Sequence, residues 1–284
     1  MTHRFLFILG MMAILSCGNW TKSKDTAKTI SWDEINDQLK AKGMVYLKDK
    51  TITGDWDWRA SASHIASTGG VTEYTIEGHL ILDNCEIEGR VGYDVKDRSA
   101  AHRGYWYGRI KLHQCHVMKT FELKDMEVRG DLNLSESTFH GDLSLVSSTV
   151  YGDLNLQKAV IAGEAMLGEM VVNGDCLLFS LECGGMMGMQ GSNIRGQLMA
   201  SVMVCDGYAD FSRIRCSGGA FINYSTFKKG FTINNSSFLD RLEILGSNFE
   251  QPLAVQKICT LYEPLIAEYK DDMITPELNT QCKS

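Results

Sequence analysis

The chain has 284 residues, a formal net charge of −7 and a hydrophobic fraction of 44%. That fraction excludes a globally disordered chain, and the acidic balance argues against an extended nucleic-acid-binding surface, which needs clustered Lys and Arg. No run of 18 or more apolar residues follows the first twenty residues, so we expect no membrane-spanning helix beyond the N-terminal segment.

Residues 1–17 have the features of a bacterial export signal. A short basic start, MTHR, precedes the apolar stretch FLFILGMMAIL, which is too short to span a bilayer. The following ILSC resembles a lipobox, in which the cysteine is lipidated and becomes the new N-terminus. We therefore predict a lipoprotein signal peptide over 1–17, lipidation of Cys17 and a polar tether over 18–30. An ordinary cleaved signal peptide and an uncleaved anchor are the alternatives.

Residues 31–43 are predicted to form a short helix that caps the following domain. Ser31 followed three residues later by Glu34 is a capping-box pattern, and Gly43 is a typical residue just after a helix end.

Residues 46–255 are predicted to form a repeat domain, because an apolar pattern returns every eleven residues. The pattern is clearest in VRGDLNLSESTFHGDLSLVSSTVYGDLNL (128–156) and runs through thirteen unbroken repeats over 106–248. Counted from Val128 as position 1, positions 1, 5 and 7 are apolar in every repeat, and position 10 is mostly small. Positions 5 and 7 flank a mostly polar position 6, as in a strand with one buried side. Gly occupies position 3 in ten repeats, where we expect a corner whose backbone must be free of Cβ constraint.

Each repeat therefore supplies two short strands and two corners, and it buries its apolar face only by stacking on its neighbours. The stretch over 205–238 resembles the pentapeptide-repeat proteins, in their variant with one extra residue per pair of pentapeptides. The resemblance implies a right-handed, four-sided β-helix with 22 residues per rung. We expect an all-β, parallel β-helix of about eight rungs, closed at its end by a helical cap and tail over 256–284. Another parallel β-helix shape is the alternative.

Two insertions interrupt the repeats near the N-terminal end, 13 residues after Trp58 and 8 residues after Tyr93. Both leave the template after position 7, and one whole repeat separates their hosts, so we expect them to lie against each other on one corner. Because loops on a rigid scaffold concentrate binding residues, we predict a binding patch for an anionic glycan or an acidic protein surface. Tolerated surface loops are the alternative. The basic members of the patch are Arg59, His64, Lys96, Arg98, His102 and Arg103, with Trp56, Trp58, Tyr105 and Tyr107 adjacent in sequence.

Most of the nine cysteines occupy inward positions and are predicted to fill the core as small hydrophobes. Cys183 and Cys205 stack 22 residues apart, which also permits a disulfide. Cys259 and Cys282 lie outside the repeats and are the candidate disulfide that would hold the tail.

Two clusters invite a metal interpretation. His113, Cys115 and His116 are close in sequence, but the register points the thiol inward and the imidazoles toward solvent, so we predict no metal and no cofactor. Aspartates stack at position 4, where a bound cation would relieve their repulsion; we favour instead hydrogen bonds from each carboxylate to its own turn.

The most consistent function is that of a non-catalytic lipoprotein anchored in the bacterial cell envelope, with the outer membrane as the favoured location. Its β-helix would present a binding surface to a protein or glycan partner and would bind no nucleic acid. One alternative is a β-helix carbohydrate-active enzyme, a polysaccharide lyase or hydrolase, which needs converging carboxylates in a walled groove. Another is an acidic pentapeptide-repeat rod that mimics DNA, which conflicts with the export signal.

Overall fold

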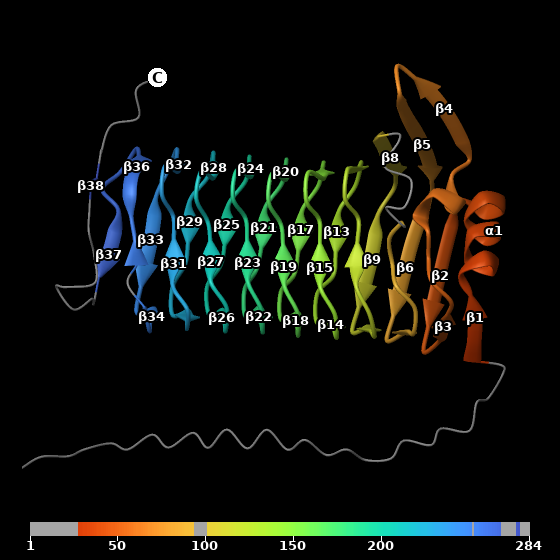
Figure 1. The fold of residues 1–284 in the computed structure, drawn as a ribbon, viewed down its shortest axis with the longest axis horizontal. Coiled ribbons are helices and arrows are strands. Elements are labelled where there is room, and N and C mark those ends of the chain that lie inside the picture. Colours follow the sequence, from red (N-terminus) through yellow and green to blue (C-terminus); the bar gives the residue numbers. More distant parts are fainter. Residues whose placement is uncertain (1–27, 94–100, 252, 268–276, 279–284) are drawn as a thin grey trace, which may run out of the picture.

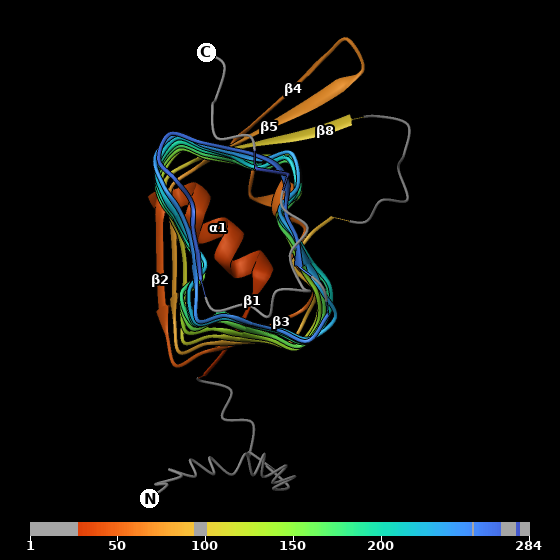
Figure 2. The ribbon, with the colours of Figure 1, turned by 90° about the vertical axis from the view of Figure 1, so that its left-hand side faces the viewer.

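The computed structural model describes residues 28–93, 101–251, 253–267 and 277–278. The chain winds into a rod of stacked coils with its N-terminal strands at one end (Figure 1). Seen along its axis, each coil has four sides, each formed by one sheet (Figure 2). Strands of successive coils pair in parallel, and in the regular region partners are 22 residues apart, as Leu132 and Leu154 are. The predicted all-β parallel solenoid is confirmed, and it is four-sided.

We name the four sheets walls A to D and give their strands in spatial order. Wall A consists of β1 (Thr29–Ser31), β3 (Thr51–Thr53), β7 (Glu86–Ile87), β10 (His116–Val117), β14 (Thr138–Phe139), β18 (Val160–Ile161), β22 (Glu182–Cys183), β26 (Val204–Cys205), β30 (Thr226–Phe227) and β34 (Asn248–Phe249). Wall B consists of β2 (Met44–Lys48), β6 (His79–Asp83), β9 (Ile110–His113), β13 (Leu132–Asn133), β17 (Leu154–Asn155), β21 (Cys176–Leu177), β25 (Leu198–Met199), β29 (Ala220–Phe221), β33 (Leu242–Leu245) and β37 (Leu265–Ala267).

Wall C is shorter, and wall D is the one that continues outside the rod. Wall C consists of β11 (Phe121–Glu122), β15 (Leu143–Ser144), β19 (Ala165–Met166), β23 (Met187–Gly188), β27 (Ala209–Asp210), β31 (Phe231–Thr232) and β35 (Leu253–Ala254). Wall D consists of β4 (His64–Thr68), β5 (Val71–Glu77), β8 (Ala101–Tyr107), β12 (Met126–Val128), β16 (Thr149–Val150), β20 (Val171–Val172), β24 (Asn193–Ile194), β28 (Arg215–Cys216), β32 (Ser237–Phe238), β36 (Gln256–Thr260) and β38 (Glu277–Leu278).

The rod has about ten rungs rather than the expected eight, because walls A and B each contain ten strands within the described residues. The additional strands come from segments assigned to tether and caps. β1 lies in the segment expected to be tether, and β36 and β37 lie where a C-terminal helix was expected.

The expected C-terminal capping helix is wrong, since the described part of that segment is extended. β36 pairs with β32, with Cys259 opposite Ser237, and β37 pairs with β33. Val255 and Ile258 are buried, whereas Leu261 is 67% exposed, so the apolar residues do not form one helical stripe. The open sheet edge of the preceding rung supplies hydrogen-bond partners for an extended chain, and Pro264 disfavours a continuous helix.

The predicted N-terminal cap is present as α1 (Trp32–Lys42). The Ser31 hydroxyl accepts a hydrogen bond from the Glu34 amide at 3.2 Å, and Gly43 ends the helix in the left-handed conformation, with φ of +64°. Ile35 and Leu39 are fully buried, so the helix lays its apolar face over the end of the rod. Figure 2 shows α1 lying across that end.

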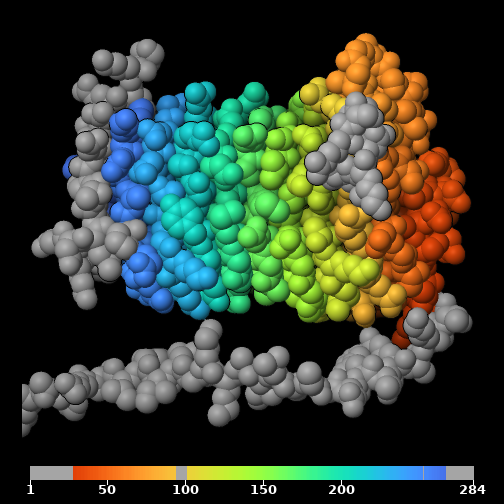
Figure 3. Space-filling view, in the orientation of Figure 1, coloured from red at the N-terminus to blue at the C-terminus, as the bar shows by residue number. Residues whose placement is uncertain are grey.

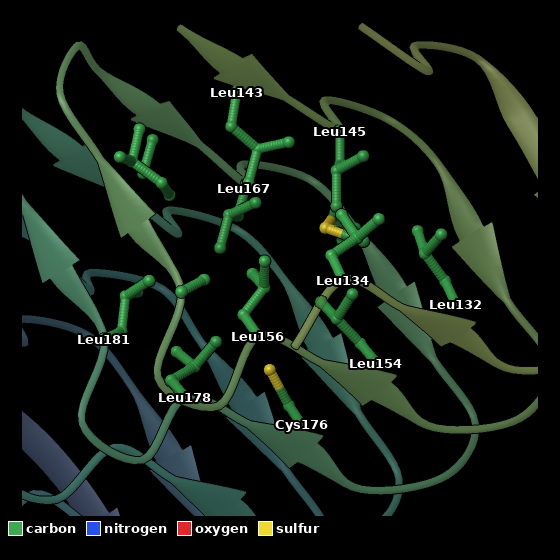
Figure 4. Close-up of a cluster of buried hydrophobic side chains, with 14 of the residues drawn as sticks. Leu132, Leu134, Leu143, Leu145, Leu154, Leu156, Leu167, Cys176, Leu178 and Leu181 are labelled. Atoms are coloured by element: carbon green, nitrogen blue, oxygen red, sulfur yellow. The ribbon is translucent and has the colours of Figure 1, made fainter. Parts of the chain in front are cut away.

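Positions 1, 5 and 7 of all thirteen repeats are buried, as the pattern predicts. The side chains of adjacent rungs stack inside the rod, with Leu132, Leu154 and Cys176 in one column (Figure 4). Each column continues from rung to rung, so the core has no internal boundary.

Position 10 is small because it forms a hydrogen-bond ladder, a role that size alone does not reveal. The Ser225 hydroxyl donates to the Ala200 carbonyl at 3.0 Å and accepts from the Met203 amide at 3.0 Å, both one rung back. The same two bonds recur at Ser137, Ser148, Ser192, Ser236 and Ser247.

The two kinds of corner have different requirements. The left-handed backbone falls at position 9, where the chain mostly uses residues other than Gly, including Val202 and Tyr224, with φ of 59° and 56°. Gly at position 3 has another cause, because a Cβ there would collide with the next rung; at Gly130 it would lie 2.6 Å from the Gly108 oxygen. Close stacking, rather than an unusual conformation, therefore selects that glycine.

Candidate interaction surface

Three strands leave the four-sided coil and form a projecting sheet near the N-terminal end, which we call the ribbon (β4, β5 and β8; Figures 1 and 2). β4 and β5 form an antiparallel hairpin, and β8 pairs in parallel with β5 along its length. The turn is Gly69-Gly70, with φ of +62° and +83°, as a two-residue type I′ turn requires. The two insertions therefore lie against each other, as predicted, but as strands that extend wall D rather than as loops.

The side chains of the ribbon alternate between two faces. Tyr74 and His102 share the face that continues the inside of the rod, since Ile76 and Trp106 follow them on the same side and are fully buried. The opposite face continues the outside of wall D. It contains His64, Glu73, Arg103 and Tyr105.

On the inner face, Arg59 and His102 belong to a cluster that braces the ribbon against the rod. Both Nε and Nη2 of Arg59 donate to the Asp57 carboxylate, at 2.9 and 2.6 Å, and this partner raises the pKa of Arg59. The guanidinium lies over the Tyr93 ring at 5.0 Å, and its Nη1 lies 3.5 Å from Nε2 of His102. Its charge is thus held by Asp57 and covered by an aromatic ring.

Aromatic contacts complete this cluster. Trp58 is fully buried and packs edge-on against both Tyr74 and Tyr93, with ring centroids 5.7 and 5.5 Å apart. The Tyr74 hydroxyl lies 3.3 Å from Nδ1 of His102. Trp58 also fits against Gly104, where a Cβ would lie 2.9 Å from the indole ring. Burial raises the pKa of Tyr93, which fits a structural role for this ring.

The outer face carries polar pairs and remains accessible. The Tyr105 hydroxyl donates to Glu73 at 3.0 Å, and a hydrogen bond to Tyr105 raises the pKa of Arg103. Further along wall D, the Arg129 guanidinium lies between two tyrosine rings, 5.6 Å from Tyr107 and 4.1 Å from Tyr151. Those tyrosines are 51% and 39% exposed. We call Glu73, Arg103, Tyr105, Tyr107, Arg129 and Tyr151 the wall D surface.

The six basic residues of the predicted patch do not share one surface. Arg59 and His102 come together on the inner face, whereas His64 and Arg103 lie on the outer face. Lys96 and Arg98 lie outside the described residues. Of the adjacent aromatics, Trp56 and Trp58 are buried, and Tyr105 and Tyr107 point outward.

A buried polar contact that the sequence pattern does not reveal joins the helical cap to the ribbon root. Nε1 of Trp56 donates to Asn36 and to Ser61, each at 3.1 Å, and the Ser61 hydroxyl donates to Asn36. The Trp56 ring also stacks on Trp32, with centroids 4.4 Å apart and planes 7° from parallel. These partners are far apart in sequence and follow no repeat, so only the fold brings them together.

The six cysteines of the repeat region are buried free thiols, including the stacked pair Cys183 and Cys205. Hydrogen bonding between these two thiols lowers the pKa of Cys205 and raises that of Cys183. Cys259 takes part in a disulfide. The partner expected for it, Cys282, and the lipidation candidate Cys17 lie outside the described residues, so both assignments stay predictions.

The residues considered for metal binding are engaged elsewhere. Nδ1 of His113 lies 2.9 Å from the Asp83 carboxylate, Cys115 is buried, and His116 is on wall A. The position-4 aspartates bond to the next rung rather than to their own turn, as Asp153 does when it accepts from the Asp175 amide at 2.8 Å. No group of three or more potential metal-ligating side chains occurs within the described ranges.

No helix in the part of the chain that the structure describes is long and apolar enough to cross a membrane. Comparison with protein-family models, with curated proteins and with solved structures gives no match to this chain. Function must therefore be inferred from the surface itself.

Proposed function

We propose that this protein is a non-catalytic lipoprotein of the bacterial cell envelope that binds a protein or glycan partner through the wall D surface. The observation that carries the proposal is the ribbon, where the chain departs from its repeat to build a projecting sheet. The chain invests two insertions and a buried aromatic brace in holding that sheet in one position. Insertions that a repeat scaffold holds rigid are typical of binding faces.

The chemistry of the wall D surface suits recognition. Tyr107 and Tyr151 present large, rigid aromatic area, and Arg129 between them contributes a charge that pairs with Glu127 at 3.0 Å. Aromatic and Arg side chains dominate the energetics of binding surfaces because they bury much area at low entropic cost. The four-sided coil and its 22-residue spacing also support assignment to the pentapeptide-repeat-like β-helices, a class that does not by itself indicate an activity.

The membrane anchor rests on residues 1–17 and on Cys17. Cys17→Ala removes the thiol that would accept the lipid, so labelling of cells with a fatty-acid analogue should mark the wild type and not the variant. The variant should also accumulate as an uncleaved or mislocalised precursor. Normal processing and localisation of Cys17→Ala would contradict the anchor.

The binding surface is tested separately. Tyr107→Ala combined with Tyr151→Ala should abolish capture of the native partner when the lipidated protein is cross-linked in intact envelopes. Tyr46→Ala is the matched control, because Tyr46 is 57% exposed on wall B, away from this surface. If the double variant captures the same protein or glycan as the wild type and the control, the wall D surface is not the binding site.

A further inference from the structure

β4 ends wall D with an open edge, at the outer side of the ribbon. The hairpin register, closed by Thr68 and Val71 around a two-residue turn, points the amides and carbonyls of His64, Ala66 and Thr68 toward β5. The amides and carbonyls of Ile65 and Ser67 therefore point away from the ribbon. Among the described residues these groups have no backbone partner.

The chain protects other strands at this end of the rod but not β4. α1 packs against β1 and β2, the first strands of walls A and B. β4, in contrast, contains no Lys, Glu, Asp or Pro, which are the residues that usually discourage edge-to-edge pairing. Its Ile65 side chain is 57% exposed. An accessible, uncharged edge of this kind is a template for another strand.

A second copy of β4 is the occupant that fits this edge. An antiparallel pair centred on Ala66 places Ile65 of each copy opposite Ser67 of the other, so that all the outward amides and carbonyls find partners. No position of the strand carries a like charge that self-pairing would bring together apart from protonated His64, which would lie opposite Thr68. The ribbon projects from the rod (Figures 1 and 3), which leaves room for a second rod beyond the edge.

We propose that β4 pairs with β4 of a second copy of this chain to form a two-fold dimer through a continuous six-stranded ribbon. The pairing is isologous, because the same strand serves both copies, and it consumes both edges. The association therefore stops at a dimer and does not produce a fibre. It uses the edge of the ribbon and leaves the wall D surface open, so it is independent of the function proposed above.

Cross-linking of the full chain in detergent tests the geometry. In the centred register Ala66 faces itself across the two-fold axis, whereas Thr68, two residues away on the same face of the strand, faces His64. Mild oxidation should therefore give a disulfide-linked dimer of Ala66→Cys and little or none of Thr68→Cys. Equal cross-linking of the two variants, or none of either, would overturn the proposal.

Sedimentation tests the association itself. Wild type should show a reversible monomer–dimer equilibrium at chain concentrations up to about 100 µM. Ser67→Pro removes an outward amide and leaves the β5 ladder intact, so it should be monomeric over that range, whereas Ser67→Ala should still dimerise. Ile65→Lys, which adds a charge to each edge, should also be monomeric. A wild type that stays monomeric, or a folded Ser67→Pro that dimerises as well as Ser67→Ala, would contradict the pairing.

Discussion

The regular rungs from Trp106 to Phe249 and the ribbon are built from similar strands but are held in different ways. In the rungs each side chain repeats the role of the residue 22 positions earlier, as the serine ladder and the leucine columns show. The ribbon has a single copy of every contact, and its position depends on a few pairs such as Arg59 with Asp57 and Trp58 with Tyr74. Repetition makes the rod tolerant of variation on its outside and intolerant of it on its inside.

The largest effect is expected at the centre of the rod. Leu154→Asp places an unpaired charge among buried leucines (Figure 4) and should lower the free energy of unfolding by more than about 4 kcal/mol. Asn155→Asp, on the outward side, keeps the oxygen that accepts from the Gln157 amide and should be nearly neutral. Denaturant unfolding of the two variants checks the register, and similar shifts would contradict it.

The serine ladder should give the next largest effect. Ser225→Ala leaves the Met203 amide and the Ala200 carbonyl without this partner and should cost about 1–3 kcal/mol. Ser225→Cys should recover part of the loss, since Cys115 occupies an equivalent position and contacts the Leu82 carbonyl at 3.5 Å. Equilibrium unfolding separates the two outcomes. If Ser225→Ala is neutral, the ladder contributes packing only.

A stabilising change is expected at a corner. Val202 is β-branched and adopts the left-handed conformation, which Asn and Gly accept more readily. Val202→Asn should therefore raise the free energy of unfolding by about 1 kcal/mol. Gly191→Val, at the equivalent corner with φ of +75°, should lower it. A destabilised Val202→Asn would show that the exposed valine side chain matters more than its backbone strain.

A smaller, pH-dependent effect is expected at Asp83. Hydrogen bonds from His113 and Lys48 hold the pKa of Asp83 below its usual range. Its contribution to stability is present above the unfolded pKa of about 3.9 and is lost as the pH falls through the lower folded value. Because the carboxylate is partly exposed, the contribution should be below about 1 kcal/mol. Asp83→Asn should flatten the pH dependence of unfolding at acidic pH and leave its slope above pH ~6 unchanged.

The sequence predicted the rod because its signal is periodic. Positions 1, 5 and 7 report burial in every repeat, and Ser31 with Gly43 reports both ends of α1. Other features depend on chain packing that no local pattern encodes. Gly130 is selected by the Gly108 backbone of the neighbouring rung, and β36 is extended because β32 offers it an open edge.

The candidate site was predictable only in its place. The spacing of the two insertions was enough to bring them together, since both leave the same corner of consecutive rungs. Composition alone could not show which face each side chain would take. Strand pairing decides that His102 points inward with Tyr74 while Arg103 points outward beside Tyr105. Asp57 is the partner of Arg59, so counting basic residues overestimated the free positive charge.

The account's central claim is that the rod is self-sufficient and the ribbon is an attachment that serves interaction. Replacing residues 67–72 by Asn-Gly shortens the hairpin while keeping a closing pair, Ala66 and Glu73, and leaves the brace at Trp58 and Tyr74 in place. The most direct measurement is thermal unfolding of this variant beside the wild type, at a concentration where both are monomeric. The account predicts melting temperatures within about 2 °C of each other. A fall as large as that caused by Leu154→Asp would contradict it, because the ribbon would then be part of what holds the rod together.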